Sequence, residues 1–129
     1  MNRPAKEWME KAEEDFEAAN RLIKGRKPLY NLVCFHAQQS AEKYIKAVVE
    51  LKGVAVPKTH DLLSIVDLAQ PELAHLLLMK QDLELLTAYA VAARYPGENA
   101  TRRQAQRSLK TARLIRESIR QRLKPLAIK

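Results

Sequence analysis

The sequence predicts an all-α protein, an up-and-down antiparallel bundle of four long helices plus one short helix. Ala, Leu, Lys, Glu, Gln and Arg dominate, and the 129 residues include only three glycines, a composition typical of helices. Apolar residues recur at helical spacing in four long stretches, and no sustained alternation predicts a strand. The length suits one compact domain, so we expect residues 1–129 to form a single domain.

The first two helices are bounded by proline and glycine. The first is expected to begin near Pro4, which suits a first turn, and to end near Gly25. The second is expected from Pro28 to about Lys52, just before Gly53. Because its first half is apolar on two sides, it should be buried on two sides, either in the middle of the bundle or in a dimer interface.

A connector over residues 54–60 leads to the short helix, expected from Leu62 to about Ala69. Thr59 or Asp61 is a suitable cap for it. A fourth, long helix is expected to begin at Pro71. Like the second helix it has two apolar sides, and this pattern predicts a homodimer.

The last helix follows the turn signal Pro96–Gly97 and is expected to begin near Asn99 as its N-cap and to run to about Leu123. Seven cationic side chains lie on the arc of this helix opposite its apolar stripe, which we call the basic arc. The basic arc consists of Arg102, Arg103, Arg107, Lys110, Arg113, Arg120 and Lys124.

The net charge of +8 is concentrated in this last segment. Residues 100–129 contain ten Lys or Arg and one acid, which gives +9, whereas residues 1–99 contain thirteen Lys or Arg and fourteen acids, which gives −1. Such asymmetry indicates an anionic partner. The alternative is a solvated, arginine-rich helix surface, and both readings stay open.

Three charged residues fall within apolar stripes: Asp15, Arg94 and Arg116. A buried unpaired ion is strongly unfavourable, so these charges should either pair with each other or line an accessible groove. The first alternative predicts an internal salt bridge such as Asp15 with Arg116 or with Arg94. The second predicts a polar cleft that holds an anionic ligand.

The apolar second helix also has a polar border. His36 and Lys43 lie two turns apart on it, with Ser40 between them. His36 is either a hydrogen-bonded structural residue or a ligand contact. The three histidines and the single Cys34 show no metal-ligand spacing, so no metal and no cofactor is expected.

The amino-terminal residues do not resemble a signal peptide, and no run is long and apolar enough for a membrane span. We therefore expect a cytoplasmic protein that does not associate with a membrane.

Three segments in a fixed order resemble the HEPN family of small bacterial and archaeal helical-bundle domains. They are FHAQQSAEKYIKAVVELKG, then VPKTHDLLSI, then ARYPGE before the last helix; AEEDFEAANRLI in the first helix fits as well. The resemblance covers nearly the whole chain. It implies a homodimer, a minimal nucleotidyltransferase as a partner within a toxin–antitoxin-type module, and a nucleotide or RNA as ligand.

Catalytic members of that family are metal-independent RNases with an Arg followed, after four to six residues, by a His. Arg94 stands at the position of the Arg, but Asn99, Ala100 and Thr101 occupy the positions where the His should fall. Cleavage through the 2′-hydroxyl needs an acid and a base, roles that suit His, whereas Arg cannot accept a proton. No catalytic residue is therefore assigned, and the sequence favours a protein that is not an enzyme.

The resemblance leaves two sets of candidate binding residues. Arg94 and Tyr95 could offer a guanidinium group to a phosphate and an aromatic ring to a base. Lys58, His60 and Asp61 lie in the matched PKTHD segment and are either ligand contacts or structural residues that tie down the connector.

The first hypothesis is a non-catalytic homodimer that binds a nucleotide or RNA and works with a nucleotidyltransferase. One alternative is an RNase toxin with an altered active site, in which His36 or His60 would supply the proton chemistry. Another is an interaction module whose basic helix docks on an acidic partner protein.

Overall fold

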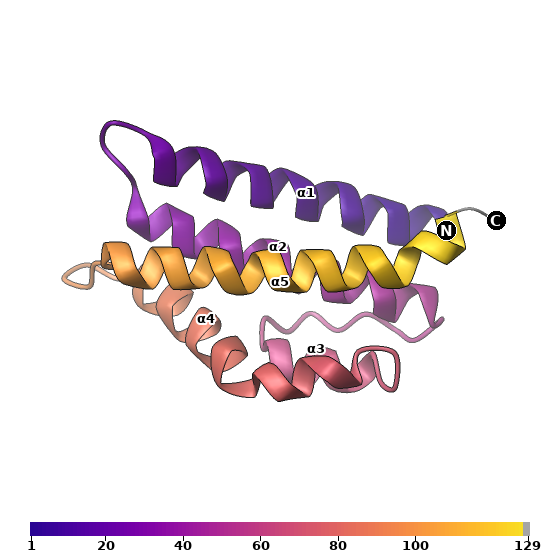
Figure 1. Ribbon diagram of the computed structural model, residues 1–129. Coiled ribbons are helices and arrows are strands. Elements are labelled where there is room, and N and C mark those ends of the chain that lie inside the picture. Colours follow the sequence, from indigo (N-terminus) through magenta and orange to yellow (C-terminus); the bar gives the residue numbers. More distant parts are fainter. Residues whose placement is uncertain (128–129) are drawn as a thin grey trace.

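The computed structural model describes the backbone of residues 1–127 and the side chains of residues 1–123 (Figure 1). Its elements are α1 (Arg3–Lys24), α2 (Tyr30–Leu51), α3 (Leu62–Leu68), the 3₁₀ helix η1 (Ala74–Met79), α4 (Lys80–Ala92) and α5 (Arg102–Ala127). Over this part of the chain there is no strand, which confirms the all-α prediction. None of the helices in the same part is long and apolar enough to cross a membrane.

Helix α1 begins at a side-chain cap and packs closely on α2. The Asn2 side chain accepts a hydrogen bond from the Ala5 amide at 2.9 Å, so one of the unpaired first-turn amides is satisfied. The buried residues of α1 are small: Ala5, Ala12 and Ala19. Because small side chains let two helix backbones approach, α1 and α2 lie side by side along most of their length (Figure 1).

Helix α2 is the centre of the molecule, as its two-sided apolar pattern predicts. It contacts α1, α3, α4 and α5. Gly53 ends it in the left-handed conformation, with φ +73°. The Gly53 amide donates to the Glu50 carbonyl at 3.1 Å and the Val54 amide donates to the Val49 carbonyl at 3.3 Å, which is the Schellman arrangement.

The segment after Pro71 differs from the expected long fourth helix. A turn and the 3₁₀ helix η1 precede α4, which has only 13 residues. Leu73 and Leu76 are both buried, a spacing of three that places residues on one face of a 3₁₀ helix as well as of an α-helix. The apolar pattern therefore continues across a change of helix type, and it does not reveal where α4 begins.

The amino-terminal cap of α5 is Thr101, so the prediction of Asn99 as N-cap is wrong. The Thr101 hydroxyl accepts the Gln104 amide at 3.1 Å, and the Gln104 side chain accepts the Thr101 amide at 3.0 Å. This reciprocal capping box satisfies two amides at once, which a single Asn cannot do. Asn99 instead bonds to Asn31, whose side chain also accepts the Ala100 amide at 2.7 Å, so the corner between α4 and α5 is fixed to the start of α2.

Candidate anion-binding site

One face of α2 is not covered by other helices. Its side chains are partly or fully exposed and recur every three or four residues, so they form one stripe along the helix. We call this the outward stripe of α2; it consists of Leu32, Phe35, His36, Gln39 and Lys43. Helix α1 flanks it on one side, and Arg94, at the corner between α4 and α5, reaches it through Phe35.

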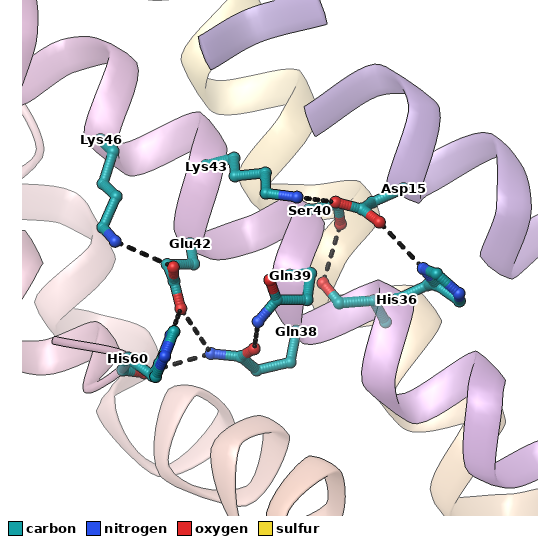
Figure 2. Close-up of polar contacts among 10 residues, drawn as sticks. Asp15, His36, Gln38, Gln39, Ser40, Glu42, Lys43, Lys46 and His60 are labelled. Atoms are coloured by element: carbon teal, nitrogen blue, oxygen red, sulfur yellow. Dashed lines mark hydrogen bonds and ion pairs between the residues drawn. The ribbon is translucent and has the colours of Figure 1, made fainter. Parts of the chain in front are cut away.

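Asp15 of α1 is paired with this stripe. One of its carboxylate oxygens lies 2.8 Å from His36 Nδ1 and the other accepts Lys43 Nζ at 2.5 Å (Figure 2). The predicted partners of Asp15, Arg116 and Arg94, are wrong. Ser40 lies between His36 and Lys43 as expected, but its buried hydroxyl donates to the Ala37 carbonyl and does not reach the site.

Arg116 is neutralised within the bundle. Its guanidinium binds both carboxylate oxygens of Glu13, at 2.8 and 3.0 Å, and lies 4.9 Å from the ring centre of Phe16. The Tyr44 hydroxyl donates to the same carboxylate at 2.8 Å. Burial acts to raise the pKa of Glu13, but the bonds from Arg116 and Tyr44 outweigh it and hold that pKa below its ordinary value. Arg116 therefore has a structural role and is not available to a ligand.

Arg94 differs from Asp15 and Arg116 because it is exposed and pairs with no carboxylate of residues 1–123. Its guanidinium carbon lies 5.1 Å from the ring centre of Phe35, an arrangement that orients a cation without neutralising it. The neighbouring Tyr95 is 61% exposed. Both residues can therefore contact an external ligand.

An open groove of ≈ 550 Å³ lies at the same corner of the molecule. Its walls come from the start of α2 and from the chain on both sides of Arg94; the lining residues are Pro28, Leu29, Tyr30, Asn31, Leu32, Ala93, Asn99 and Ala100. The corner thus combines an unpaired cation, an exposed aromatic ring and a concave surface.

The second predicted set, Lys58, His60 and Asp61, has mainly structural contacts. His60 Nδ1 lies 2.8 Å from Glu42 Oε1, and the Gln38 side chain donates to the His60 carbonyl at 3.1 Å (Figure 2). Asp61 precedes α3 and accepts the Ser64 hydroxyl at 2.6 Å, without a side-chain cap bond to the helix backbone. Lys58 is exposed. None of these contacts joins the set to Arg94.

The Glu42 contact reveals a buried ion pair that the sequence analysis missed. Lys46 Nζ donates to Glu42 Oε2 at 2.9 Å, and the two side chains are only 5% and 4% exposed. The Lys46 ammonium also lies 5.3 Å from the ring centre of Trp8. The signal was present as Glu and Lys four residues apart within an apolar run, a spacing that places both on one helix face.

The basic arc of α5 is exposed wherever its side chains are described, from Arg102 to Arg120. Arg107 pairs with Asp82 at 3.1 Å. The other five of these cations have no carboxylate partner within residues 1–123. The Lys124 side chain lies outside the described part. The same part of the chain contains no group of three or more acidic, His or Cys residues that could hold a metal ion.

These features define a small helical domain with an exposed, largely unneutralised basic surface. The HEPN domain model matches residues 5–122, so the chain belongs to the HEPN domain family. No curated protein matches it. Among solved structures, the crystal structure of TT1696 from Thermus thermophilus is 23% identical, with a TM-score of 0.73, over 95% of this chain and 100% of that one. At that identity the likeness shows the shared fold alone.

Proposed function

We propose that this HEPN protein binds single-stranded RNA or a nucleotide through the basic arc of α5 and the Arg94 corner. The observation that carries the proposal is the absence of carboxylate partners, within residues 1–123, for Arg94 and for five cations of the arc. Exposed cations attract phosphates, and an exposed aromatic ring such as that of Tyr95 can stack on a base. In catalytic family members a histidine follows the Arg, but none follows Arg94 at that spacing. The proposed function is therefore binding, and it does not use the cleavage motif of the family.

Three arginines of the arc offer a direct test of this function. Arg102, Arg113 and Arg120 are exposed, and a variant with all three changed to Gln keeps most of the side-chain length while removing three charges. We expect its affinity for a fluorescent 20-nucleotide RNA to fall at least tenfold, because phosphate contacts supply most of such binding. Equal anisotropy titrations of the variant and the wild type would show that the arc does not bind RNA.

A matched control comes from α1. Arg3 and Arg21 are also exposed, but each already pairs with a glutamate one helical turn away, Glu7 and Glu17 respectively. Changing both to Gln removes two arginines from a surface that carries its own carboxylates. We expect this variant to bind RNA within about twofold of the wild type. If the protein is instead an interaction module that docks on an acidic partner, neither the wild type nor this variant binds RNA, and the basic arc captures the partner protein.

The proposal includes a homodimer. Leu29 and Leu32 are 50% and 44% exposed at the start of α2, beside the groove, and an exposed apolar pair at one place is a suitable contact for a second copy. Light scattering at micromolar concentration should give twice the chain mass of 14.7 kDa. Changing Leu29 and Leu32 to Asp should shift that mass to one chain, and a single-chain mass for the wild type contradicts the dimer.

The family resemblance also supports a partner, a minimal nucleotidyltransferase in a toxin–antitoxin-type module in the cytoplasm. The test is co-purification with the product of the neighbouring gene, followed by measurement of growth when each protein is expressed alone and together. A neighbouring gene of another class, with no complex, would remove this part of the proposal.

A further inference from the structure

Two asparagines at the corner between α4 and α5 form a chain of hydrogen bonds with a fixed direction. The Ala100 amide donates to Asn31 Oδ1 at 2.7 Å, and Asn31 Nδ2 donates to Asn99 Oδ1 at 3.2 Å. Because a backbone amide only donates, the Asn31 atom that faces it is the oxygen, and the amino group of Asn31 faces Asn99. An amino group also only donates, so Asn99 turns its oxygen toward Asn31 and presents its own amino group elsewhere.

These amino groups belong to the wall of the open groove. Asn31 and Asn99 both line its ≈ 550 Å³. Asn99 is exposed, and its Nδ2 has no hydrogen-bond partner within residues 1–123. Asn31 Nδ2 uses one of its two hydrogens for Asn99 and keeps the other. The groove wall therefore offers hydrogen-bond donors in a fixed orientation, and none of the lining residues in the described part of the chain is acidic.

The remaining lining of the groove is mainly apolar and includes one aromatic residue. A concave surface of this size, mostly apolar and with a few oriented polar groups, is typical of a small-ligand site. The ligand that suits it has a flat apolar body and hydrogen-bond acceptors along one edge. The lining residues other than the two asparagines and Ala100 are Pro28, Leu29, Tyr30, Leu32 and Ala93.

We propose that the amino groups of Asn31 and Asn99 make this groove selective for guanine in single-stranded RNA. This inference rests on the proposed binding of RNA and adds the choice of base. Guanine carries two neighbouring acceptors, O6 and N7, on one edge, and this edge has no donor. It therefore matches a wall that offers only amide hydrogens.

The other bases match these donors less well. Adenine and cytosine carry an amino group on the corresponding edge, so an N–H of the base would face an N–H of the protein. Uracil offers the single acceptor O4 there. A donor left without an acceptor weakens binding, and this mismatch is what makes a polar site selective.

The proposed dimer contact leaves this wall free. Leu29 and Leu32 are three residues apart, so they share one side of α2. Asn31 lies about 100° or more around the helix axis from both leucines, because successive residues are turned by about 100°. A second copy that packs on the two leucines therefore contacts a different side of α2 from the one that carries the amino group of Asn31.

The experiment compares fluorescent single-stranded RNAs of equal length and charge by anisotropy titration. One strand carries guanosine and another adenosine at the same few positions, with uridine elsewhere, so the phosphate contacts are the same. We expect the wild type to bind the guanosine strand about tenfold more tightly. Inosine, which keeps O6 and N7, should bind like guanosine, whereas 7-deazaguanosine, which lacks N7, should bind more weakly.

Variants assign this preference to the two asparagines. In Asn99→Ala the ratio of the two affinities should fall to about one. Asn31→Asp keeps an acceptor for the Ala100 amide but removes the donor that orients Asn99, so the ratio should fall there as well. Gln81→Ala, at an exposed amide of α4 that does not line the groove, is the matched control and should keep the wild-type ratio. Circular dichroism checks that each variant is helical.

The outcomes separate this inference from the proposed function. Equal affinities of the wild type for the guanosine and adenosine strands would overturn the inference and leave RNA binding standing. An unchanged ratio in Asn99→Ala, or 7-deazaguanosine bound as tightly as guanosine, would also overturn it. Absence of binding to every strand would overturn both the inference and the proposed function.

Discussion

The buried ion pair of α2 gives a stability prediction whose size follows from the structure. Glu42 and Lys46 are 4% and 5% exposed, and Glu42 also contacts His60 and Gln38. Glu42→Ala leaves the Lys46 ammonium buried without its carboxylate, with the centre of the Trp8 ring 5.3 Å away. Removing one partner of a buried pair costs about 3–5 kcal/mol. That is a large part of the roughly 5–15 kcal/mol that stabilises a typical domain.

Urea unfolding followed by circular dichroism measures this cost. With a slope of about 2 kcal/mol per molar urea, the midpoint should fall by roughly 2 M. Glu50→Ala is the matched control, because Glu50 lies on the same helix and makes none of the contacts of Glu42; it should change stability by less than about 0.5 kcal/mol. The double variant Glu42→Leu with Lys46→Leu should regain most of the loss, since apolar replacement of a whole pair is often neutral. A loss below about 1 kcal/mol for Glu42→Ala would refute this reasoning.

Two further predictions concern the end of α2 and the state of a histidine. Gly53→Ala should cost about 1–2 kcal/mol in urea unfolding, because the φ of +73° strains any residue with a Cβ although the space around it is open; an unchanged midpoint would contradict the assigned turn. Burial, and to a smaller extent the nearby charge of Arg122, lowers the pKa of His75 from its ordinary 6.5. The unfolded chain therefore binds a proton at His75 more readily than the folded protein does. Stability from this group is therefore present above pH 6.5 and is lost as the pH falls through the lower folded pKa. The melting temperature of His75→Gln should accordingly fall less between pH 7.5 and pH 5.5 than that of the wild type, and equal falls would show that His75 does not contribute.

Local signals predicted the helices well where one residue decides the conformation. Pro4 lies in the first turn of α1, and Gly53 follows the end of α2. The start of α4 was not predictable, because Leu73 and Leu76 fit a 3₁₀ helix and an α-helix equally. The cap of α5 was not predictable from Asn99 alone, since Thr101 with Gln104 satisfies one more amide.

The sequence singles out the candidate residues, but it does not predict which groups of the protein they contact. The charge asymmetry located the basic arc, and the family resemblance located Arg94. Which cation Asp15 binds depends on how α1 is rotated about its own axis against α2. Helical periodicity does not fix this rotation closely enough to identify the partner. The pattern therefore suggested an arginine as the ion-pair partner of Asp15, whereas the packing of α1 on α2 brings Asp15 to His36 and Lys43. The stacking of Arg94 on Phe35 depends on the same three-dimensional arrangement.

The central claim is that the basic arc and the Arg94 corner form an open surface for the phosphates of RNA. Its most direct test is the affinity of the wild-type protein for a single-stranded RNA between 50 and 200 mM salt, a range of about fourfold. The logarithm of the association constant should fall linearly with the logarithm of the salt concentration, with a slope of about −0.7 for each phosphate contacted. The variant in which Arg102, Arg113 and Arg120 are Gln should give a shallower slope. An affinity that does not change with salt, or no measurable binding at low salt, would contradict the account.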